Sequence, residues 1–92
     1  MPSYLVETYL AHGKAAEREA RERRARSAAE ELTRENIPVR FEQSIHVPED
    51  EMCFIVFDAP SSRDAVLAAQ RARLDPVRVV EAVASSGEEE KK

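Results

Sequence analysis

Two runs of alternating apolar and polar residues flank an acidic turn, and this arrangement constrains the fold more than any other feature of the chain. The first run spans residues 39–47, the second spans residues 52–58, and the sequence Pro-Glu-Asp-Glu lies between them. Runs of β-branched and aromatic residues on either side of a short polar turn are typical of a β-hairpin. We therefore expect the two runs to pair as antiparallel strands.

Outside the hairpin, the sequence predicts a strand and a helix before it and a helix and a strand after it. Aromatic and branched side chains favour strands, and long stretches of Ala, Glu, Arg and Leu without Gly or Pro favour helices. Ser61 and Ser62 are both candidates for the N-cap of the second helix. The predicted elements are a strand over 3–10, a helix over 14–36, a helix over 63–74 and a strand over 77–84.

The element order is therefore β-α-β-β-α-β, which predicts an α+β protein with the ferredoxin-like plait. Each crossover is expected to be right-handed, so both helices lie on one face of a four-stranded antiparallel sheet. We assign residues 1–84 to one ferredoxin-like domain and residues 85–92 to a charged flexible tail.

The charge run from Glu17 to Arg26 is interpreted as a solvated helix face with ion pairs at i,i+4 spacing.

Composition excludes several classes of function. The 92 residues carry a formal net charge of −4, and no basic cluster lies on a predicted strand, so we expect no nucleic-acid partner. A single cysteine cannot form an internal disulfide, and no apolar run is long enough to span a membrane. The N-terminus lacks the pattern of a secretory signal. We expect a cytoplasmic protein with no membrane partner.

The alternation in the first hairpin strand predicts which side chains face the helices. We expect the apolar set to face them and the polar set to lie on the opposite, open face of the sheet. The apolar set is Val39, Phe41, Ile45 and Val47, and the polar set is Arg40, Glu42, Ser44 and His46.

A hairpin that closes on Val47 and Met52 places His46 directly opposite Cys53. The same register sets Ser44 against Ile55 and Glu42 against Phe57. A slip of one residue would place His46 opposite Met52 or Phe54 instead. The sequence alone leaves both registers open.

The open face is predicted to be too apolar to remain uncovered. We expect Leu5, Tyr9, Ile55 and Phe57 to be exposed on it. Contiguous apolar patches of this kind mark interfaces. The sequence therefore predicts a homodimer in which the two open sheet faces pack together into an α/β barrel.

Four side chains form a candidate metal site on this open face, namely Glu7, His46, Cys53 and Glu81. A glutamate in mid-strand is unfavourable in a core, so Glu7 and Glu81 are expected on the open face of neighbouring strands. Imidazole, thiolate and carboxylate together suit nickel or zinc. The alternative is structural: a strand-end His46 near solvent, a small buried Cys53, and glutamates in ion pairs with Arg40 and Arg78.

Several segments resemble the small bacterial nickel-binding ferredoxin-like proteins, a family long classed as a domain of unknown function. The resemblance covers about residues 2–83 and implies a cytoplasmic homodimeric α/β barrel that binds nickel. It is carried by Pro2-Ser-Tyr-Leu-Val-Glu7, Pro38-Val-Arg-Phe41, Ser44-Ile-His-Val-Pro-Glu-Asp-Glu51, Cys53-Phe54, Phe57-Asp-Ala-Pro-Ser61 and Val79-Val80-Glu81.

Two other functions stay open at this point. Dimeric plaits house small-molecule-binding and monooxygenase-like activities, and Tyr9, His46 and Glu7 could transfer protons if they converge. An interaction module that docks a partner on its sheet face or charged helix is the third hypothesis.

Overall fold

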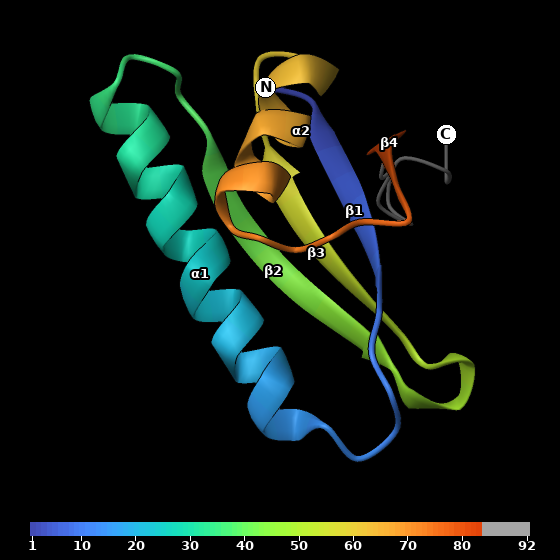
Figure 1. The fold of residues 1–92 in the computed structure, drawn as a ribbon. Helices are drawn as coiled ribbons and strands as arrows, with labels where there is room; N and C mark the ends of the chain where they lie inside the picture. The colour runs from blue at the N-terminus through green and yellow to red at the C-terminus, as the bar shows by residue number, and fades with distance from the viewer. Residues whose placement is uncertain (84–92) are drawn as a thin grey trace, which may run out of the picture.

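Four strands and two helices follow one another in the predicted β-α-β-β-α-β order (Figure 1). The structure is a computed structural model, and it describes residues 1–83. The predicted tail over 85–92 therefore lies outside the described residues. The elements are β1 (Ser3–Tyr9), α1 (Ala15–Arg34), β2 (Arg40–Val47), a 3-10 turn (Pro48–Asp50), β3 (Met52–Asp58), α2 (Ser62–Arg71) and β4 (Arg78–Ala82).

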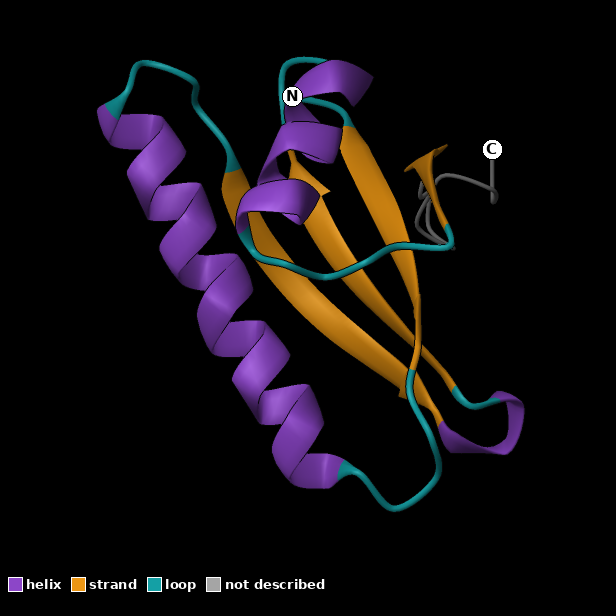
Figure 2. Cartoon of the chain, in the orientation of Figure 1, coloured by secondary structure: helices purple, strands orange, loops and turns teal. Residues whose placement is uncertain are grey.

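The strands form one antiparallel sheet in the order β2-β3-β1-β4. Both helices lie on the same side of it, as Figure 2 shows, with α1 running along β2 and α2 packed against β1 and β4. This arrangement is the ferredoxin-like plait, so the fold prediction is confirmed. No helix among residues 1–83 is both long and apolar enough to cross a membrane.

Alanines form most of the contact between the helices and the sheet. In α1 the buried residues are Ala25, Ala28, Ala29 and Leu32, and in α2 they are Ala65, Ala68 and Ala69. They pack on strand side chains that include Tyr4, Val6, Ile55 and Phe57. Because alanine side chains are small, both helices approach the sheet closely, and the core is a single thin layer.

Local signals fix the ends of both helices. The Ser61 hydroxyl accepts a hydrogen bond from the Asp64 backbone N–H at 3.2 Å, so Ser61 is the N-cap of α2. Beyond the last turn of α1, Asn36 adopts a left-handed φ of 71°, and the Ile37 N–H returns to the Leu32 carbonyl at 2.9 Å. This Schellman-type ending, followed by Pro38, stops the helix where the sequence predicts.

Near its turn the hairpin has the register that closes on Val47 and Met52, one of the two that the sequence left open, and farther from the turn the register changes. His46 pairs with Cys53 and Ser44 pairs with Ile55. A β-bulge between Phe41 and Gln43 then inserts one extra residue, so Phe57 pairs with Phe41. The predicted pairing of Glu42 with Phe57 is therefore wrong, because a bulge moves every residue beyond it by one position.

The bulge also changes which side chains of β2 face the helices. Directly opposed residues share a face of an antiparallel sheet, and Cys53 and Ile55 are both fully buried in the core beneath the helices. Their partners His46 and Ser44 therefore lie on the helix side, and Ile45 lies on the open face. The expected orientation holds for the N-terminal part of β2 and is wrong for its C-terminal half.

The third strand presents the opposite set from the one predicted. Ile55 and Phe57 are completely buried on the helix side, since they pair with Val6 and Tyr4 of β1. The open face is instead formed by the intervening residues. Its apolar side chains are Leu5, Tyr9, Ile45, Val47, Met52, Phe54, Val56 and Val80.

The alanine contacts predict a strong dependence of stability on side-chain size. Ala25 is completely buried in α1, whereas Ala16 in the first turn of the same helix is exposed. Ala25→Leu should lower the free energy of unfolding by about 1–3 kcal/mol because the larger side chain forces the helix off the sheet. Ala16→Leu is the matched control and should change it by less than about 0.5 kcal/mol in urea titrations. An equal effect of both substitutions would contradict the close packing.

Candidate functional site

His46 and Cys53 face each other across β2 and β3 on the helix side of the sheet. The His46 Nε2 atom is buried and has no hydrogen-bond partner among residues 1–83. Cys53 is completely buried, and this burial is the main cause that raises the pKa of its thiol, despite the nearby positive charges of Arg21 and Arg18. The pair therefore consists of an uncharged thiol and an imidazole whose Nε2 atom has no hydrogen-bond partner among residues 1–83.

A carboxylate from α1 reaches the same part of the sheet. The Ser44 hydroxyl, two residues before His46, donates a hydrogen bond to Glu22 Oε2. The guanidinium of Arg18 lies 3.9 Å from the same carboxylate oxygen. Glu22 is thus held over β2 by one hydroxyl and one positive charge.

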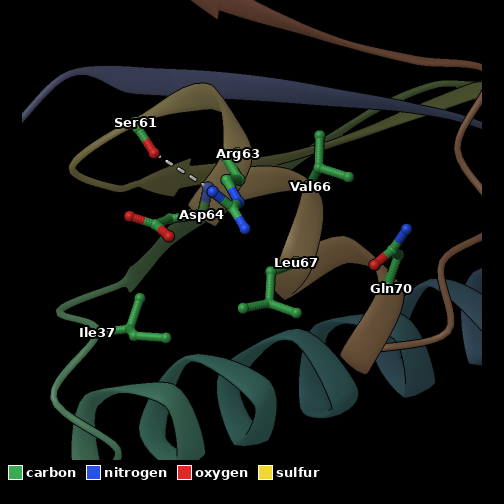
Figure 3. Close-up of a pocket in the computed structure, with 7 residues that line it drawn as sticks. All are labelled: Ile37, Ser61, Arg63, Asp64, Val66, Leu67 and Gln70. Carbon is green, nitrogen blue, oxygen red and sulfur yellow. Dashed lines mark hydrogen bonds between the residues drawn. The ribbon is translucent and has the colours of Figure 1, made fainter.

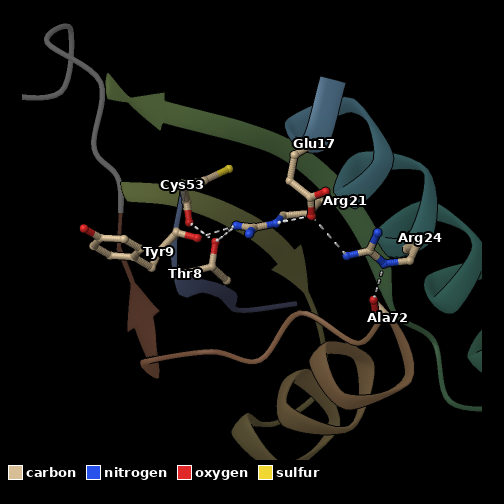
Figure 4. Close-up of polar contacts among 7 residues, drawn as sticks. All are labelled: Thr8, Tyr9, Glu17, Arg21, Arg24, Cys53 and Ala72. Atoms are coloured by element: carbon tan, nitrogen blue, oxygen red, sulfur yellow. Dashed lines mark hydrogen bonds and ion pairs between the residues drawn. The ribbon is translucent and has the colours of Figure 1, made fainter. Parts of the chain in front are cut away.

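Arg21 anchors α1 to the end of β1, as Figure 4 shows. Its Nη1 donates to Thr8 Oγ1 at 2.9 Å and to the Tyr9 carbonyl at 2.8 Å. Thr8 Oγ1 in turn donates to the Cys53 carbonyl at 2.7 Å. The Arg21 side chain is only 15% exposed. The expected i,i+4 ion pair is present, since Arg21 Nε lies 3.2 Å from Glu17 Oε2. The expectation of a solvated side chain is wrong at Arg21, because its guanidinium binds to the end of β1.

The two predicted glutamates lie on different faces of the sheet. Glu7 is on the open face, where its Oε2 accepts a hydrogen bond from Arg78 Nε at 2.6 Å, and its side chain is 14% exposed. Glu81 pairs with Tyr4, which faces the helices, and it is exposed on the edge strand. The prediction that both lie on the open face is wrong for Glu81. Arg78 is paired with Glu7 and shares its face, whereas Glu81 is paired with Tyr4 and so lies on the helix side.

The four predicted ligands therefore do not surround one point. Among the described residues, no group of three or more His, Cys, Asp or Glu side chains is arranged to hold a metal ion. Of the four predicted ligands, His46 and Cys53 are paired in register, and the imidazole Nε2 has no hydrogen-bond partner among residues 1–83. Nitrogen and sulfur donors of this kind suit a nickel-type ion. Glu7 is engaged by Arg78, and Glu81 lies on the edge strand, two strands away from Cys53.

The proton-transfer group of Tyr9, His46 and Glu7 is also divided between the two faces. Tyr9 and Glu7 lie on the open face, whereas His46 lies beneath α1. The Tyr9 hydroxyl donates to Glu51 Oε1 at 2.8 Å, and this contact raises the pKa of the phenol. The three side chains form no common site within one copy of the chain.

A charged cluster that the sequence did not predict lies at the bulge. Arg40 Nη2 donates to Glu42 Oε2 at 2.6 Å and to Asp58 Oδ2 at 2.7 Å, and Ser3 Oγ donates to Asp58 Oδ1 at 2.7 Å. The extra residue of the bulge, Glu42, brings a second carboxylate to Arg40. Only the pairing register reveals this cluster, because nothing in the sequence marks residue 42 as a bulge.

A hollow of about 710 Å³ lies between the start of β2 and α2, as Figure 3 shows. Its apolar side chains come from Ile37, Val66 and Leu67, and Arg63 and Asp64 carry its charges. None of the predicted site residues lines it. We assign it no chemistry.

Comparisons with known proteins place the fold and leave the function open. No protein-family model and no curated protein matches the chain. Among solved structures, the protein SCO4226 from Streptomyces coelicolor A3(2) superposes with a TM-score of 0.67 over 91% of this chain and 99% of that chain. The two sequences are 19% identical. At this identity, the similarity shows the fold alone.

The Asp58 cluster predicts a dependence of stability on pH. Burial raises the pKa of the Asp58 carboxyl, but its contacts with Glu42, Ser3 and Arg40 lower it by more, so the folded pKa lies below 3.8. A carboxyl with a depressed folded pKa stabilises the fold above its unfolded pKa, and this contribution is lost as the pH falls through the folded value. Urea titrations at pH 7 and below pH 4 should therefore show a smaller acid-induced loss of stability for Asp58→Asn than for the wild type. An equal loss in both proteins would contradict the assignment.

Proposed function

We propose that two copies of this chain pair through their open sheet faces, and that the dimer binds a divalent transition metal ion of the nickel type. The observation that supports the proposal most strongly is the uncovered sheet face. Both helices pack on the other side, so no helix or strand within residues 1–83 lies over the apolar residues that this face presents.

The open face has the composition of an interface between identical copies. Tyr9 and Ile45 are 60% and 41% exposed, and Leu5 and Phe54 beside them are half-buried. A two-fold axis through the face would set each apolar patch against its own copy, as in an isologous dimer. Burial of this patch would remove from water an apolar surface that a monomer would otherwise expose.

The charged groups on this face are compatible with burial in a dimer. A lone buried carboxylate is strongly unfavourable, but Glu7 already has the guanidinium of Arg78 at 2.6 Å. Asp58 is likewise paired with Arg40 at 2.7 Å. The second copy would therefore cover two ion pairs, in each of which the carboxylate already has a positively charged partner.

The metal-binding part of the proposal rests on His46 and Cys53. The imidazole Nε2 has no hydrogen-bond partner among residues 1–83, and the thiol lies directly opposite in the pairing register. Nitrogen and sulfur donors suit nickel and zinc. A bound ion would supply the positive charge that makes the thiolate stable in this buried place.

The dimer is tested by placing a charge on the open face. Ile45→Glu should shift the protein from twice its mass of 10.4 kDa towards the monomer, because two copies would bury unpaired carboxylates at their interface. Light scattering after size exclusion measures the mass. Ala16→Glu, which adds the same charge on the helix side, is the control and should stay dimeric. A wild-type monomer at all concentrations would contradict the pairing.

The metal pair is tested by calorimetry with Ni²⁺ on the untagged protein. His46→Ala and Cys53→Ser should each weaken binding by about tenfold or more, since each removes one donor atom. Glu81→Gln should bind like the wild type, because Glu81 is remote from the pair. Affinity should rise with pH, since burial raises the pKa of the Cys53 thiol and the ion must displace its proton.

Two outcomes of this titration would contradict the assignment. A loss confined to Glu7→Gln would place the ion on the open face, and unchanged affinity in both His46→Ala and Cys53→Ser would remove the pair from the site. The solution mass of each variant is measured separately by light scattering. A loss of Ni²⁺ affinity can therefore be distinguished from a loss of the dimer.

A further inference from the structure

Four arginines gather around a cavity between α1 and the C-terminal end of α2. The cavity has a volume of about 360 Å³. Its lining residues are Arg23, Arg24, Ser27, Ala28, Glu31, Arg71 and Arg73. Three carboxylates lie close to these four arginines, because Glu31 and Glu35 pair with Arg71 and Glu17 pairs with Arg24. The remaining small excess of positive charge is opposite in sign to the formal net charge of the chain, which is −4.

Two of the four guanidinium groups are held in place by other parts of the fold. Arg24 Nε donates to the Ala72 carbonyl at 2.9 Å, as Figure 4 shows, and so satisfies a carbonyl at the end of α2. Arg71 donates from both terminal nitrogens to Glu35, at 2.5 and 3.2 Å. These two arginines have a structural role, and the same contacts fix their positions at the cavity.

The other two arginines have no such role. Arg23 and Arg73 are exposed, and neither makes an ion pair or a side-chain hydrogen bond with any residue in the described range 1–83. Arg73 follows the C-cap of α2 and adopts a left-handed φ of 55°, and the N–H of Leu74 returns to the Ala69 carbonyl at 3.1 Å, so this conformation belongs to a Schellman-type helix ending. Glycine is the residue favoured at that position, and the ending itself does not require an arginine side chain.

We propose that this cavity binds a small phosphorylated anion. Guanidinium groups match phosphate oxygens in charge and geometry, often through two parallel hydrogen bonds. Arg23 and Arg73 supply the unpaired charge, Arg24 and Arg71 form a fixed wall, and the Ser27 hydroxyl adds a neutral donor. The buried Ala28 leaves room at the base of the cavity.

The site is independent of the proposed dimer and of the metal pair. It is formed by helix residues, whereas the proposed dimer uses the opposite face of the sheet, so pairing would leave the cavity open to solvent. It shares no residue with the His46–Cys53 pair. Failure of either proposal would therefore leave the other untouched.

Inorganic pyrophosphate is a suitable probe, with binding measured by phosphorus NMR and by calorimetry at low salt. The wild type should bind it saturably, and Arg23→Gln and Arg73→Gln should each weaken the affinity by about tenfold, as expected for loss of one charge-assisted contact. Affinity should fall as salt is added. Arg63→Gln is the matched control, since Arg63 is an exposed arginine that lines the other hollow.

Absence of saturable binding by the wild type would overturn the proposal. So would an equal loss in Arg63→Gln, which would show a general effect of net charge. A short glutamate-rich peptide serves as a competitor. If it bound with the same dependence on Arg23 and Arg73 while pyrophosphate did not, the cavity would be a docking site for acidic protein segments, and the proposal would be wrong.

Discussion

The packing of both helices against one face of the sheet is the constraint on which the rest of the structure depends. Alanines such as Ala25 and Ala69 bring the helices close to Val6, Ile55 and Phe57. The right-handed crossovers leave no third element among residues 1–83 to cover the other face. The apolar residues of that face, the ion pair of Glu7 with Arg78, and the proposal of a second copy all follow from this one-sided arrangement.

The β-bulge in β2 separates the side chains that a regular strand would have placed together. Beyond Phe41 the strand gains one residue, so Ser44 and His46 turn towards the helices. Glu7 stays on the opposite face. The four predicted ligands are thereby divided into the His46–Cys53 pair beneath α1, the Glu7 carboxylate paired with Arg78, and the exposed Glu81 on the edge strand. The bulge also brings Glu42 to Arg40, which creates a charged cluster at the other end of the strand.

The features predicted correctly from the sequence are those set by local chemistry. The order of elements, the Ser61 cap and the helix ending near Asn36 depend on residues close together in the chain. The pairing of His46 with Cys53 is one of the two registers that the sequence left open, and the structure selects it. The faces of β2 could not be predicted, because Phe41 and Ile45 belong to one apolar alternation and only the bulge between them turns Ile45 to the open face. The faces of β3 could not be predicted, because Phe54 and Ile55 are neighbouring apolar residues. The orientation of β3 is decided by pairing with Tyr4 and Val6 of β1, a contact distant in sequence.

The helix layer and the open face suit different partners. The helix layer carries arginines, of which Arg21 and Arg24 fasten α1 to the strands and to α2, while Arg23 and Arg73 line a cavity. The open face carries aliphatic and aromatic side chains, and its carboxylates Asp58 and Glu7 are paired with arginines. The proposed anion site lies on the first surface, and the proposed pairing of two copies uses the second.

Pairing of two copies through the open face is the central claim, and NMR on a mixture of isotope-labelled and unlabelled chains tests it most directly. Filtered spectra of the mixture detect only contacts between different copies. The account predicts contacts among the side chains of Leu5, Ile45 and Phe54, all of which lie on that face. Contacts between copies that involve only residues of α1 or α2, or none at all, would contradict it.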